Sequence, residues 1–353
     1  MYEAVKAQAA ILRDRGAVPV LLGGGDRSFD WESDERLTGA EVHRLREAGP
    51  EALAFMPGLL KMLPNAHLDL LHLHGIWQYP SFAAAVWAKQ SGQPLLISPH
   101  GMVDPWITGR NRWKKALAET AWERRCWSRA AAFHALTGAE ANDIQCHTGK
   151  TNIAIIPNAA PPVPAAPVQN RSPTLLYLSR IHPKKNLSAL LDGWTAARPL
   201  LPPQANLVIA GWGAERDRSV IEQRCAAAPA TKFVGPIFGA AKERLLASAR
   251  FLILPSFSEG LPMVVLEAWA HGTPTLMSTA CHLPQGFAAG VAIDCGTNAQ
   301  SIARAIIVGF ALPEQEWHRM AAAGRQLSAG QFGRSTVAQA WEHTYASLLD
   351  TRA

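Results

Sequence analysis

The chain of 353 residues has few cysteines, and no two of them form a C-x-x-C motif. Their number is odd and they lie far apart, at Cys126, Cys146, Cys225, Cys281 and Cys295. This distribution argues against a disulfide framework and against a zinc site built on paired thiolates. The sequence therefore predicts reduced, buried thiols.

Long apolar runs are also missing. No run reaches the roughly eighteen residues that a membrane-spanning helix needs. Residues 1–16 lack the basic-then-apolar order of a signal peptide and instead predict an amphipathic helix that ends at Gly16. We therefore expect a cytoplasmic protein.

Several signature motifs are absent as well. No G-x-G-x-x-G follows an expected strand, which disfavours a dinucleotide-dependent dehydrogenase, and no H-E-x-x-H occurs. The formal charge of +6 favours anionic partners. No recognisable nucleic-acid-binding module accompanies that charge, so no nucleic-acid partner is expected.

What the sequence does contain is an alternation of short apolar runs with longer helical patterns, typical of parallel sheets wrapped by helices. The expected strands are residues 18–22, 68–73, 95–98, 131–136 and 153–156, then 174–178, 206–210, 232–234, 251–254 and 275–277. The fold class is therefore α/β, with two doubly wound, Rossmann-like domains.

A proline-rich stretch separates the two series of strands. Residues 158–173 contain too much proline for a helix or a strand and predict a linker. We expect an N-terminal domain at residues 1–157 and a C-terminal domain at residues 174–335, with a helix at residues 336–353 that packs back on the first domain.

The stretch LPSFSEGLPMVVLEAWAHGTP, residues 254–274, predicts a strand, a loop and then a helix over residues 262–270. Glu259 lies beside the helix start, where the amides of residues 261–264 have no helical partner, and Gly260 lets a ligand approach the backbone. Glu267 lies within an apolar helix face, where a carboxylate is costly unless it has a partner. A polar ligand and a purely structural Glu267 held by a nearby Arg or Lys both remain open.

Two cations follow the first strand of the second domain. LYLSRIHPKKNLSALL places Arg180 just after that strand and Lys185 before a helix. Cations beside a helix N-terminus can bind a diphosphate, the Arg bidentately and the Lys as a point charge. A solvated, charged turn is the alternative.

In the first domain, LDLLHLHGIWQYPS and LLISPHGMVDPW each end a strand with His-Gly. His74 and His100 are therefore expected at the same edge of the sheet. A structural role is common for single histidines, and paired histidines also suit a metal. No third ligand with metal-site spacing is evident, so no metal is expected.

Residues 106–130 interleave lysines and arginines with four tryptophans. Such a composition is typical of helices at an anionic membrane interface. A solvated helix whose tryptophans face the core is the alternative.

The combination of SRIHPKKN with PSFSEGLPMVVLEAWAHGTP resembles the retaining GT-B glycosyltransferases with two glutamates separated by seven residues (glycosyltransferase family 4, group 1). SPHGMVDPW, WERRCW and HALT resemble the branch that makes bacterial surface polysaccharides. The resemblance covers nearly the whole chain. Asn186 departs from the family pattern, which usually has glycine there.

This resemblance implies a GT-B enzyme whose two domains face a central cleft and whose substrates are a nucleotide-sugar, with UDP or GDP as the expected nucleotide, and a saccharide or lipid-linked acceptor. It implies catalytic roles for His100 and Glu259 and acceptor-side roles for His74 and Trp77. The implied donor-binding residues are Arg180, Lys185, Gly260, Leu261, Pro262, Met263, Val264 and Glu267.

Protein cations and helix amides would stabilise the leaving diphosphate without a metal or other cofactor. The expected place of action is the cytoplasm, at the inner face of the membrane. The alternative is a non-catalytic or truncated GT-B protein that binds a sugar nucleotide or a partner enzyme. The resembled family begins with a strand and a Gly-Gly loop, whereas this chain begins with a helix, so we expect Met1 to be internal to a longer natural chain.

Overall fold

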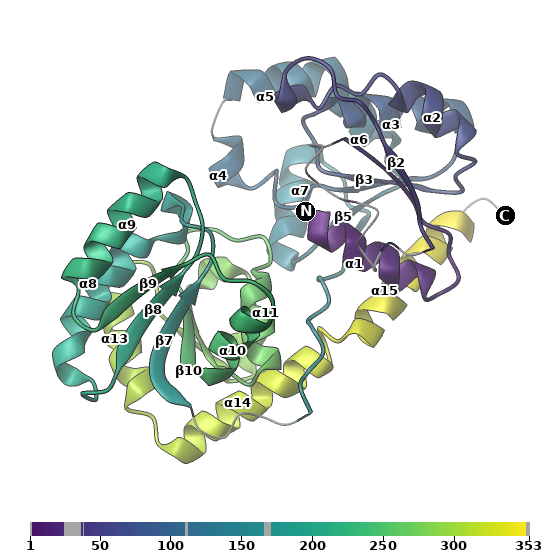
Figure 1. Cartoon of the computed structure of the whole chain (residues 1–353). Helices are drawn as coiled ribbons and strands as arrows, with labels where there is room; N and C mark the ends of the chain where they lie inside the picture. Colours follow the sequence, from purple (N-terminus) through teal and green to yellow (C-terminus); the bar gives the residue numbers. More distant parts are fainter. Residues whose placement is uncertain (1, 25–36, 38, 110–111, 166–170, 351–353) are drawn as a thin grey trace. The chain divides into compact units, whose positions relative to one another are not determined.

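The computed structural model describes residues 2–24, 37, 39–109, 112–165 and 171–350. The chain divides into two compact units, residues 1–158 with 335–353 and residues 159–334. The colours of Figure 1 follow the chain through the first unit, then the second, and back to the first with the last helix. Among the described residues, no helix is long and apolar enough to cross a membrane.

The first unit contains two parallel sheets. One pairs β1 (Val20–Gly23) with β2 (Glu41–Arg44), and the other has the order β3-β4-β5-β6. The four-stranded sheet consists of β3 (Leu71–His74), β4 (Leu95–Ser98), β5 (Ala132–Ala135) and β6 (Ile153–Ile155). All four residues of β4 and of β5 are buried, which explains why both strands stand out as apolar runs.

Helices surround these sheets. They are α1 (Tyr2–Arg13), α2 (Leu59–Asn65), α3 (Tyr79–Ser91), α4 (Pro105–Thr108), α5 (Arg112–Ala118), α6 (Arg124–Arg129), α7 (Gly138–Thr148) and α15 (Arg334–Asp350). The first and last helices, α1 and α15, lie side by side, because Gln8 donates to the Tyr345 hydroxyl (2.9 Å) and Arg15 pairs with Glu342 (2.9 Å). The two ends of the described chain therefore meet in one unit.

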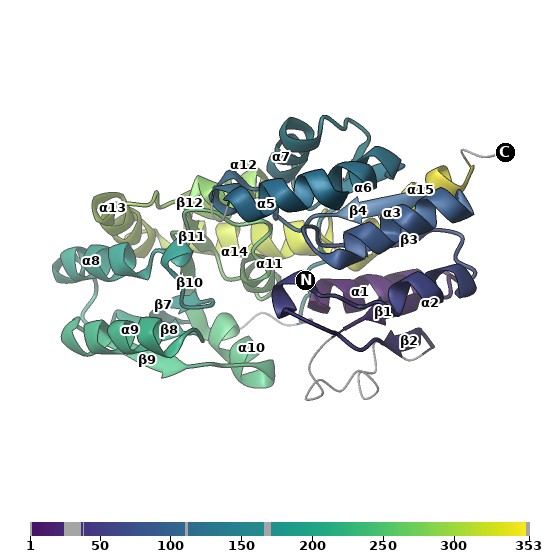
Figure 2. The same ribbon diagram turned by 90° about the horizontal axis from the view of Figure 1, so that it is seen from above.

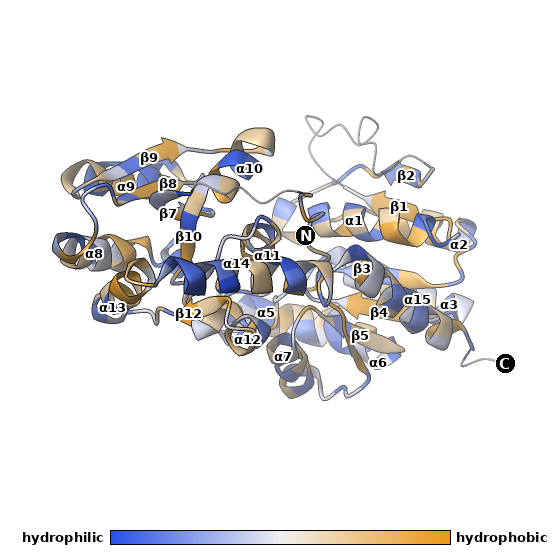
Figure 3. Ribbon diagram, turned by 90° about the horizontal axis from the view of Figure 1, so that it is seen from below, coloured by the Kyte–Doolittle hydropathy of each residue, from blue (hydrophilic) through white to orange (hydrophobic). Residues whose placement is uncertain are grey.

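The second unit is a six-stranded parallel sheet in the order β12-β11-β10-β7-β8-β9. Its strands are β7 (Ser172–Leu178), β8 (Asn206–Ala210), β9 (Thr231–Gly235), β10 (Ala249–Leu254), β11 (Thr275–Met277) and β12 (Ala292–Asp294). Figure 2 shows this unit from above, and Figure 3 shows hydrophobic residues in orange on strands such as β9 and β10.

Helices cover both faces of this sheet, with α8, α9 and α13 on one side and α10, α11 and α14 on the other (Figure 1). The helices of the unit are α8 (Leu187–Ala197), α9 (Glu215–Ala227), α10 (Gly239–Ser248), α11 (Met263–Ala270), α12 (Pro284–Ala288), α13 (Ala299–Phe310) and α14 (Glu314–Ala329). The predicted doubly wound α/β architecture is confirmed in this unit.

Ten predicted strands correspond to β1 and to β3 through β11, with boundaries that differ by a few residues. Two strands were missed. The β2 segment has one hydrophobic residue, Val42, and none of its four residues is buried, while β12 has one buried residue and ends in the exposed Asp294. Neither segment offers the apolar run by which a strand is recognised.

Two further expectations meet the structure at the cysteines and the N-terminus. The prediction that all five thiols are buried is wrong for Cys146, which lies on the solvent-facing side of α7. A free thiol is confirmed at all five positions. The helix at the beginning of the chain is confirmed as α1, and the prediction of a preceding strand concerns residues outside this chain and stays a prediction.

Candidate functional site

In the parallel sheet of the second unit, the order in which the chain adds strands reverses between β7 and β10. From β7 the chain proceeds outward through β8 and β9, whereas β10, β11 and β12 follow one another on the opposite side. Loops that leave the carboxyl ends of the two central strands diverge at such a switch point and leave a crevice that commonly binds ligands in open α/β sheets. The loop after β7 carries Arg180 and Lys185, and the loop after β10 carries Glu259.

Lys185 and Glu259 meet at this switch point. The Lys185 Nζ lies 2.6 Å and 2.8 Å from the two carboxylate oxygens of Glu259, and the side chains are 16% and 9% exposed. The Ser256 hydroxyl also donates to Glu259 Oε1 (2.6 Å). The carboxylate thus has fixed donors on both oxygens, and an ion pair links the two central loops.

The backbone conformation of Asn186 explains why asparagine can replace the glycine that the resembled family has at this position. Its backbone is left-handed, with φ of 60°, a region that glycine adopts freely and that asparagine tolerates better than most other residues. Its side-chain amide donates to the carbonyls of Pro255 (3.1 Å) and Thr297 (2.7 Å). Asparagine therefore keeps the turn after Lys185 and ties it to the β10 loop.

Helix α11 begins directly after the Glu259 loop. Pro262 is its N-cap and Met263 its first residue, so the amides of Met263 and Val264 have no acceptor within the helix. Leu261 and Pro262 are buried, and Gly260, Met263 and Val264 are half-buried. The helix start, with its partial positive charge, therefore lies in the same loop as Glu259.

Glu267 lies one turn further along α11 and forms an ion pair with Lys242 of α10, with Nζ and Oε1 2.7 Å apart. The two side chains are 27% and 20% exposed. This pair supplies the cation that a structural Glu267 requires, and it equally places a carboxylate at a partly exposed position near the helix start. Its role stays a prediction.

Arg180 follows β7 and is exposed, and its backbone carbonyl accepts a hydrogen bond from the Tyr177 hydroxyl (3.3 Å). The structure thus brings Lys185, Glu259 and residues 260–264 to one end of the sheet, with Arg180 in the same β7 loop. Lys242 and Ser256 were not predicted. The ion pair of Lys242 joins residues 25 positions apart, which no local pattern reveals.

In the first unit, His74 and His100 come together as predicted. His74 ends β3 and His100 follows the neighbouring strand β4, and His74 Nδ1 lies 2.9 Å from His100 Nε2. His100 has a left-handed backbone, with φ of 54°. The buried Glu140 accepts hydrogen bonds from the amides of Gly101 (2.5 Å) and Leu136 (2.8 Å), so a carboxylate holds the His100 turn in place.

The two predicted histidines belong to a larger cluster that the sequence did not reveal. His72 Nε2 contacts the Ser98 hydroxyl (2.6 Å), which in turn contacts His134 Nδ1 (2.7 Å). Tyr345 of α15 contacts His72 Nδ1 (2.7 Å). We call His72, His74, His100 and His134 the histidine cluster.

Burial sets the protonation of the histidine cluster. Burial, followed by repulsion from neighbouring histidines, holds the pKa values of His72 and His74 well below their usual value. Burial lowers the pKa of His100 to about 3 and that of His134 to about 4. All four rings are therefore neutral at pH 7.

Trp77 is partly buried and packs against the core of the first unit. Its ring packs against those of Trp127 and His147, and its indole Nε1 donates to the Met102 carbonyl (3.2 Å). Its backbone amide donates to Glu123 (2.5 Å), a carboxyl whose pKa burial raises to about 7. These contacts give Trp77 a structural role, and its predicted acceptor-side role stays a prediction.

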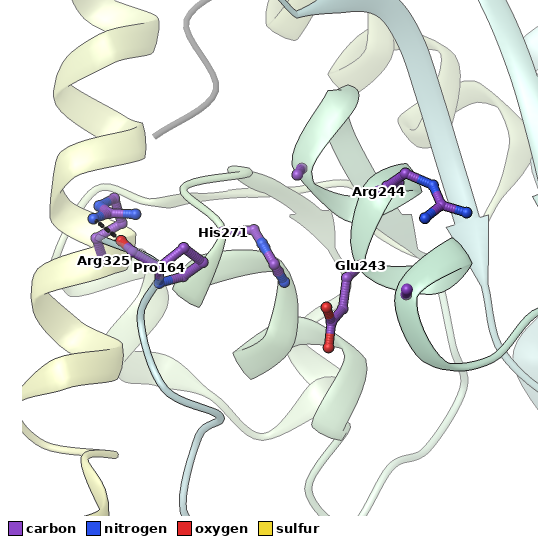
Figure 4. A pocket seen from close by; sticks show the side chains of 7 residues that line it. Pro164, Glu243, Arg244, His271 and Arg325 are labelled. Carbon is purple, nitrogen blue, oxygen red and sulfur yellow. Dashed lines mark hydrogen bonds between the residues drawn. The ribbon is translucent and has the colours of Figure 1, made fainter. Parts of the chain in front are cut away.

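A separate pocket of about 320 Å³ lies in the second unit (Figure 4). The Arg325 guanidinium donates to the Pro164 carbonyl there (2.6 Å) and so holds the segment that precedes β7. None of the predicted site residues lines this pocket, whose walls are Pro164, Ala240, Glu243, Arg244, Ala247, His271 and Arg325. It is therefore distinct from the Lys185–Glu259 site.

Within the described ranges, no group of three or more His, Cys, Asp or Glu side chains has the geometry of a metal site. The expectation of metal-independent chemistry stays a prediction.

Curated relatives match parts of the chain. A D-inositol 3-phosphate glycosyltransferase of Salinispora tropica is 29% identical over 51% of this chain and 38% of its own length. An O-antigen chain mannosyltransferase B of Escherichia coli is 27% identical over 44% of this chain and 41% of its own length. The matched segments thus span about two-fifths of these relatives.

Solved structures match the fold over nearly the whole chain. HepE of Anabaena, solved in complex with UDP and glucose, aligns with a TM-score of 0.74 and 17% identity, covering 98% of this chain and 95% of its own. This likeness shows the GT-B fold.

Family models match both halves of the chain. Residues 2–159 match the glycosyl transferase 4-like domain, and residues 172–309 match the glycosyl transferases group 1. The second match contains β7 through β12 and the Lys185–Glu259 site, so the chain combines a glycosyl transferase 4-like domain with a group 1 glycosyltransferase domain.

Proposed function

We propose that this chain is a retaining glycosyltransferase that moves a sugar from a nucleoside-diphosphate sugar to a saccharide or lipid-linked saccharide in surface-polysaccharide synthesis. The observation that carries the proposal is the Lys185–Glu259 pair at the switch point of the six-stranded sheet, beside the first amides of α11. A cation, a carboxylate and free amides within two adjoining loops suit a ligand with both phosphates and hydroxyl groups.

The chemistry follows from charge. Transfer breaks the bond between the sugar C1 and a phosphate oxygen, and the negative charge that develops on the diphosphate is stabilised by Arg180, Lys185 and the α11 amides. A bond forms between C1 and the acceptor oxygen on the same face of the sugar. The acceptor proton passes to the departing phosphate oxygen, so the configuration at C1 is retained without a carboxylate pair around the bond.

In this scheme Glu259 accepts hydrogen bonds from sugar hydroxyls and Glu267 binds the ribose. His100 has a catalytic role, and His74 has an acceptor-side role. The similar proteins support a nucleotide-sugar donor. HepE was solved with UDP and glucose, and the Escherichia coli relative is a mannosyltransferase of O-antigen chains. A UDP- or GDP-sugar is therefore the proposed donor.

The proposed place of action is the inner face of the membrane. Helix α5 exposes Trp113 (69%) and Leu117 (64%), four residues apart on one side, among exposed Arg112 and Lys114. An aromatic and an aliphatic side chain surrounded by cations suit an anionic lipid surface. This surface favours a lipid-linked acceptor.

The experiment is a thermal-shift screen of UDP-, GDP- and ADP-sugars, followed by an assay of nucleoside diphosphate release with lipid-linked oligosaccharide acceptors. A ligand that binds only the folded chain raises its melting temperature. We expect one donor to do so and to release its diphosphate in the presence of EDTA. Binding without release would favour the non-catalytic alternative, and complete loss in EDTA with recovery in magnesium would contradict the metal-free mechanism.

A further inference from the structure

Two exposed aromatic side chains lie in contact at the end of the six-stranded sheet where Arg180 also lies. Trp212 follows β8 and is 44% exposed, and Phe238 follows β9 and is 64% exposed. Their ring centroids are 5.5 Å apart at an interplanar angle of 44°. Exposing two large rings is unfavourable unless something covers them.

The register of the strands locates Trp212 beside Arg180. Leu178 pairs with Ala210 and, further along, Ile181 bridges Gly213. The offset is 32 residues in both pairs, so Arg180 and Trp212 are opposite each other in the extension of the β7–β8 ladder. Directly opposite residues of adjacent strands extend to the same face of the sheet.

Glycines on either side hold Trp212 against the Arg180 segment. A Cβ on Gly211 would lie 2.2 Å from the Ser179 carbonyl oxygen, and one on Gly213 would lie 2.5 Å from that of Ile181. The Ile181 amide also donates to the Trp212 carbonyl (2.6 Å). The two segments therefore approach at backbone contact, and the Trp212 position is fixed relative to Arg180.

Phe238 connects the aromatic pair to Glu267, another of the predicted donor-binding residues. It is the N-cap of α10, and Lys242, one turn later on that helix, forms the ion pair with Glu267. The aromatic pair is therefore linked to Arg180 through the β7–β8 register and to the Lys242–Glu267 pair through the first turn of α10. These are the groups to which the diphosphate and the ribose are assigned in the proposed function.

We infer that Trp212 and Phe238 form the surface on which the nucleobase of the donor stacks. This inference rests on the proposed function and extends it to the third part of the nucleotide. Non-bonded carbon atoms are best separated by about 3.5–4.0 Å, so the 5.5 Å between the two centroids is too short to admit a base between the rings. The base therefore covers the outer face of the pair, and the contact accepts uracil, guanine or adenine because every base has a π-face.

The test measures binding of UDP, GDP, ADP and inorganic pyrophosphate to the full chain by calorimetry. In Trp212→Ala and Phe238→Ala, we expect the Kd of the tightest-binding nucleoside diphosphate to rise by roughly 5- to 100-fold, the range that loss of one stacked base predicts. The Kd of pyrophosphate should change by less than about twofold, because it has no base to stack. Trp212→Phe and Phe238→Tyr should retain most of the wild-type affinity for the nucleotide.

Val220→Ala is the matched control, because Val220 is an exposed apolar residue of the same unit on α9. Unchanged nucleotide affinity in both alanine variants would overturn the inference, as would equal losses for the nucleotide and pyrophosphate, which indicate a general disturbance of the loop. If the wild-type chain binds none of the three nucleotides, the proposed function fails at that step. Binding that survives in the alanine variants refutes the aromatic surface alone.

Discussion

Lys185 and Glu259 hold each other in a nearly buried position, so the function and the stability of this site are coupled. Removing one member of a buried ion pair leaves an uncompensated charge, which typically costs about 3–5 kcal/mol. A single substitution therefore confuses the loss of a ligand contact with the loss of folding. The informative comparison is between the single and the double variants.

We predict that Lys185→Met lowers the melting temperature more than the double variant Lys185→Met/Glu259→Gln does, because the double variant leaves no unpaired charge. Glycosyl transfer should be reduced about ten- to hundredfold or more in both, since each lacks a charge-assisted bond to the diphosphate. Paired melting curves and initial rates measure the two effects. Recovery of activity along with stability in the double variant would assign the pair a structural role only.

Glu267 poses the same question in a form that a change of ligand can answer. If its carboxylate binds the ribose, a 2′,3′-dideoxynucleoside diphosphate should bind the wild-type chain about tenfold more weakly than the normal nucleotide. In Glu267→Gln this difference should shrink, because the two changes remove the same contact. A dideoxy penalty that is equal in both proteins would leave Glu267 as the structural partner of Lys242.

At the scale of elements, the strands that were predicted share one property. Both β4 and β8 carry uninterrupted apolar runs, and their boundaries were predicted without error. The strands β2 and β12 could not be found because β2 pairs only with β1 and has no buried residue, and β12 has one buried residue and ends in the exposed Asp294. Their pairing depends on neighbours that are distant in sequence.

The same distinction separates the parts of the site that could be predicted from those that could not. Arg180, Glu259 and His100 follow strands, so the rule for carboxyl ends of parallel strands finds them. The partners Lys242 and Ser98, by contrast, are defined by side-chain contacts across elements. Trp212 lies in a common glycine turn, and its significance depends on the register between β7 and β8.

Helix α5 leads to a prediction about membrane adsorption. We expect the chain to adsorb to vesicles containing phosphatidylserine at low salt and to detach at high salt, because lysines and arginines near an anionic surface each contribute modestly to binding. Lys114→Gln should weaken adsorption roughly fivefold, and Trp113→Ser/Leu117→Ser should weaken it further. Co-sedimentation measures both effects.

The charge-matched control for this helix is Lys232→Gln, at an exposed position on β9 of the second unit. It should leave adsorption nearly unchanged. If the wild-type chain does not sediment with anionic vesicles even at low salt, α5 is a solvated helix and the membrane proposal is wrong.

At the scale of the whole molecule, the histidine cluster makes the stability of the first unit sensitive to acid. The cluster belongs to the first unit, and the pKa of each ring is below its ordinary value of about 6.5. As the pH falls below 6.5, the unfolded chain takes up these protons while the folded chain does not. The free energy of unfolding therefore decreases toward acid pH, by up to about 1.4 kcal/mol per pH unit for each ring.

Two buried carboxyl groups in the same unit act in the opposite direction. Burial raises the pKa of Glu123 to about 7 and also raises that of Glu140. Between roughly pH 4.5 and 7 the folded chain holds the Glu123 proton more tightly than the unfolded chain does, so this group stabilises the fold as the pH falls. Four histidines outnumber two carboxyl groups, and the net effect of acid on the first unit remains destabilising.

We therefore predict that a calorimetric scan, which shows the units as separate transitions when they unfold independently, has one transition that moves to lower temperature between pH 7 and pH 5. His134→Asn should make the melting temperature depend less on pH, because it removes one of the four rings that take up a proton on unfolding. Glu123→Gln should make that dependence steeper, because it removes a group that acts in the opposite direction. His318→Asn, on the exposed surface of α14 in the second unit, is the matched control. It should leave the pH dependence of that transition unchanged. If His134→Asn and the control give the same slope, the cluster is protonated in the folded chain and the acid sensitivity has another origin.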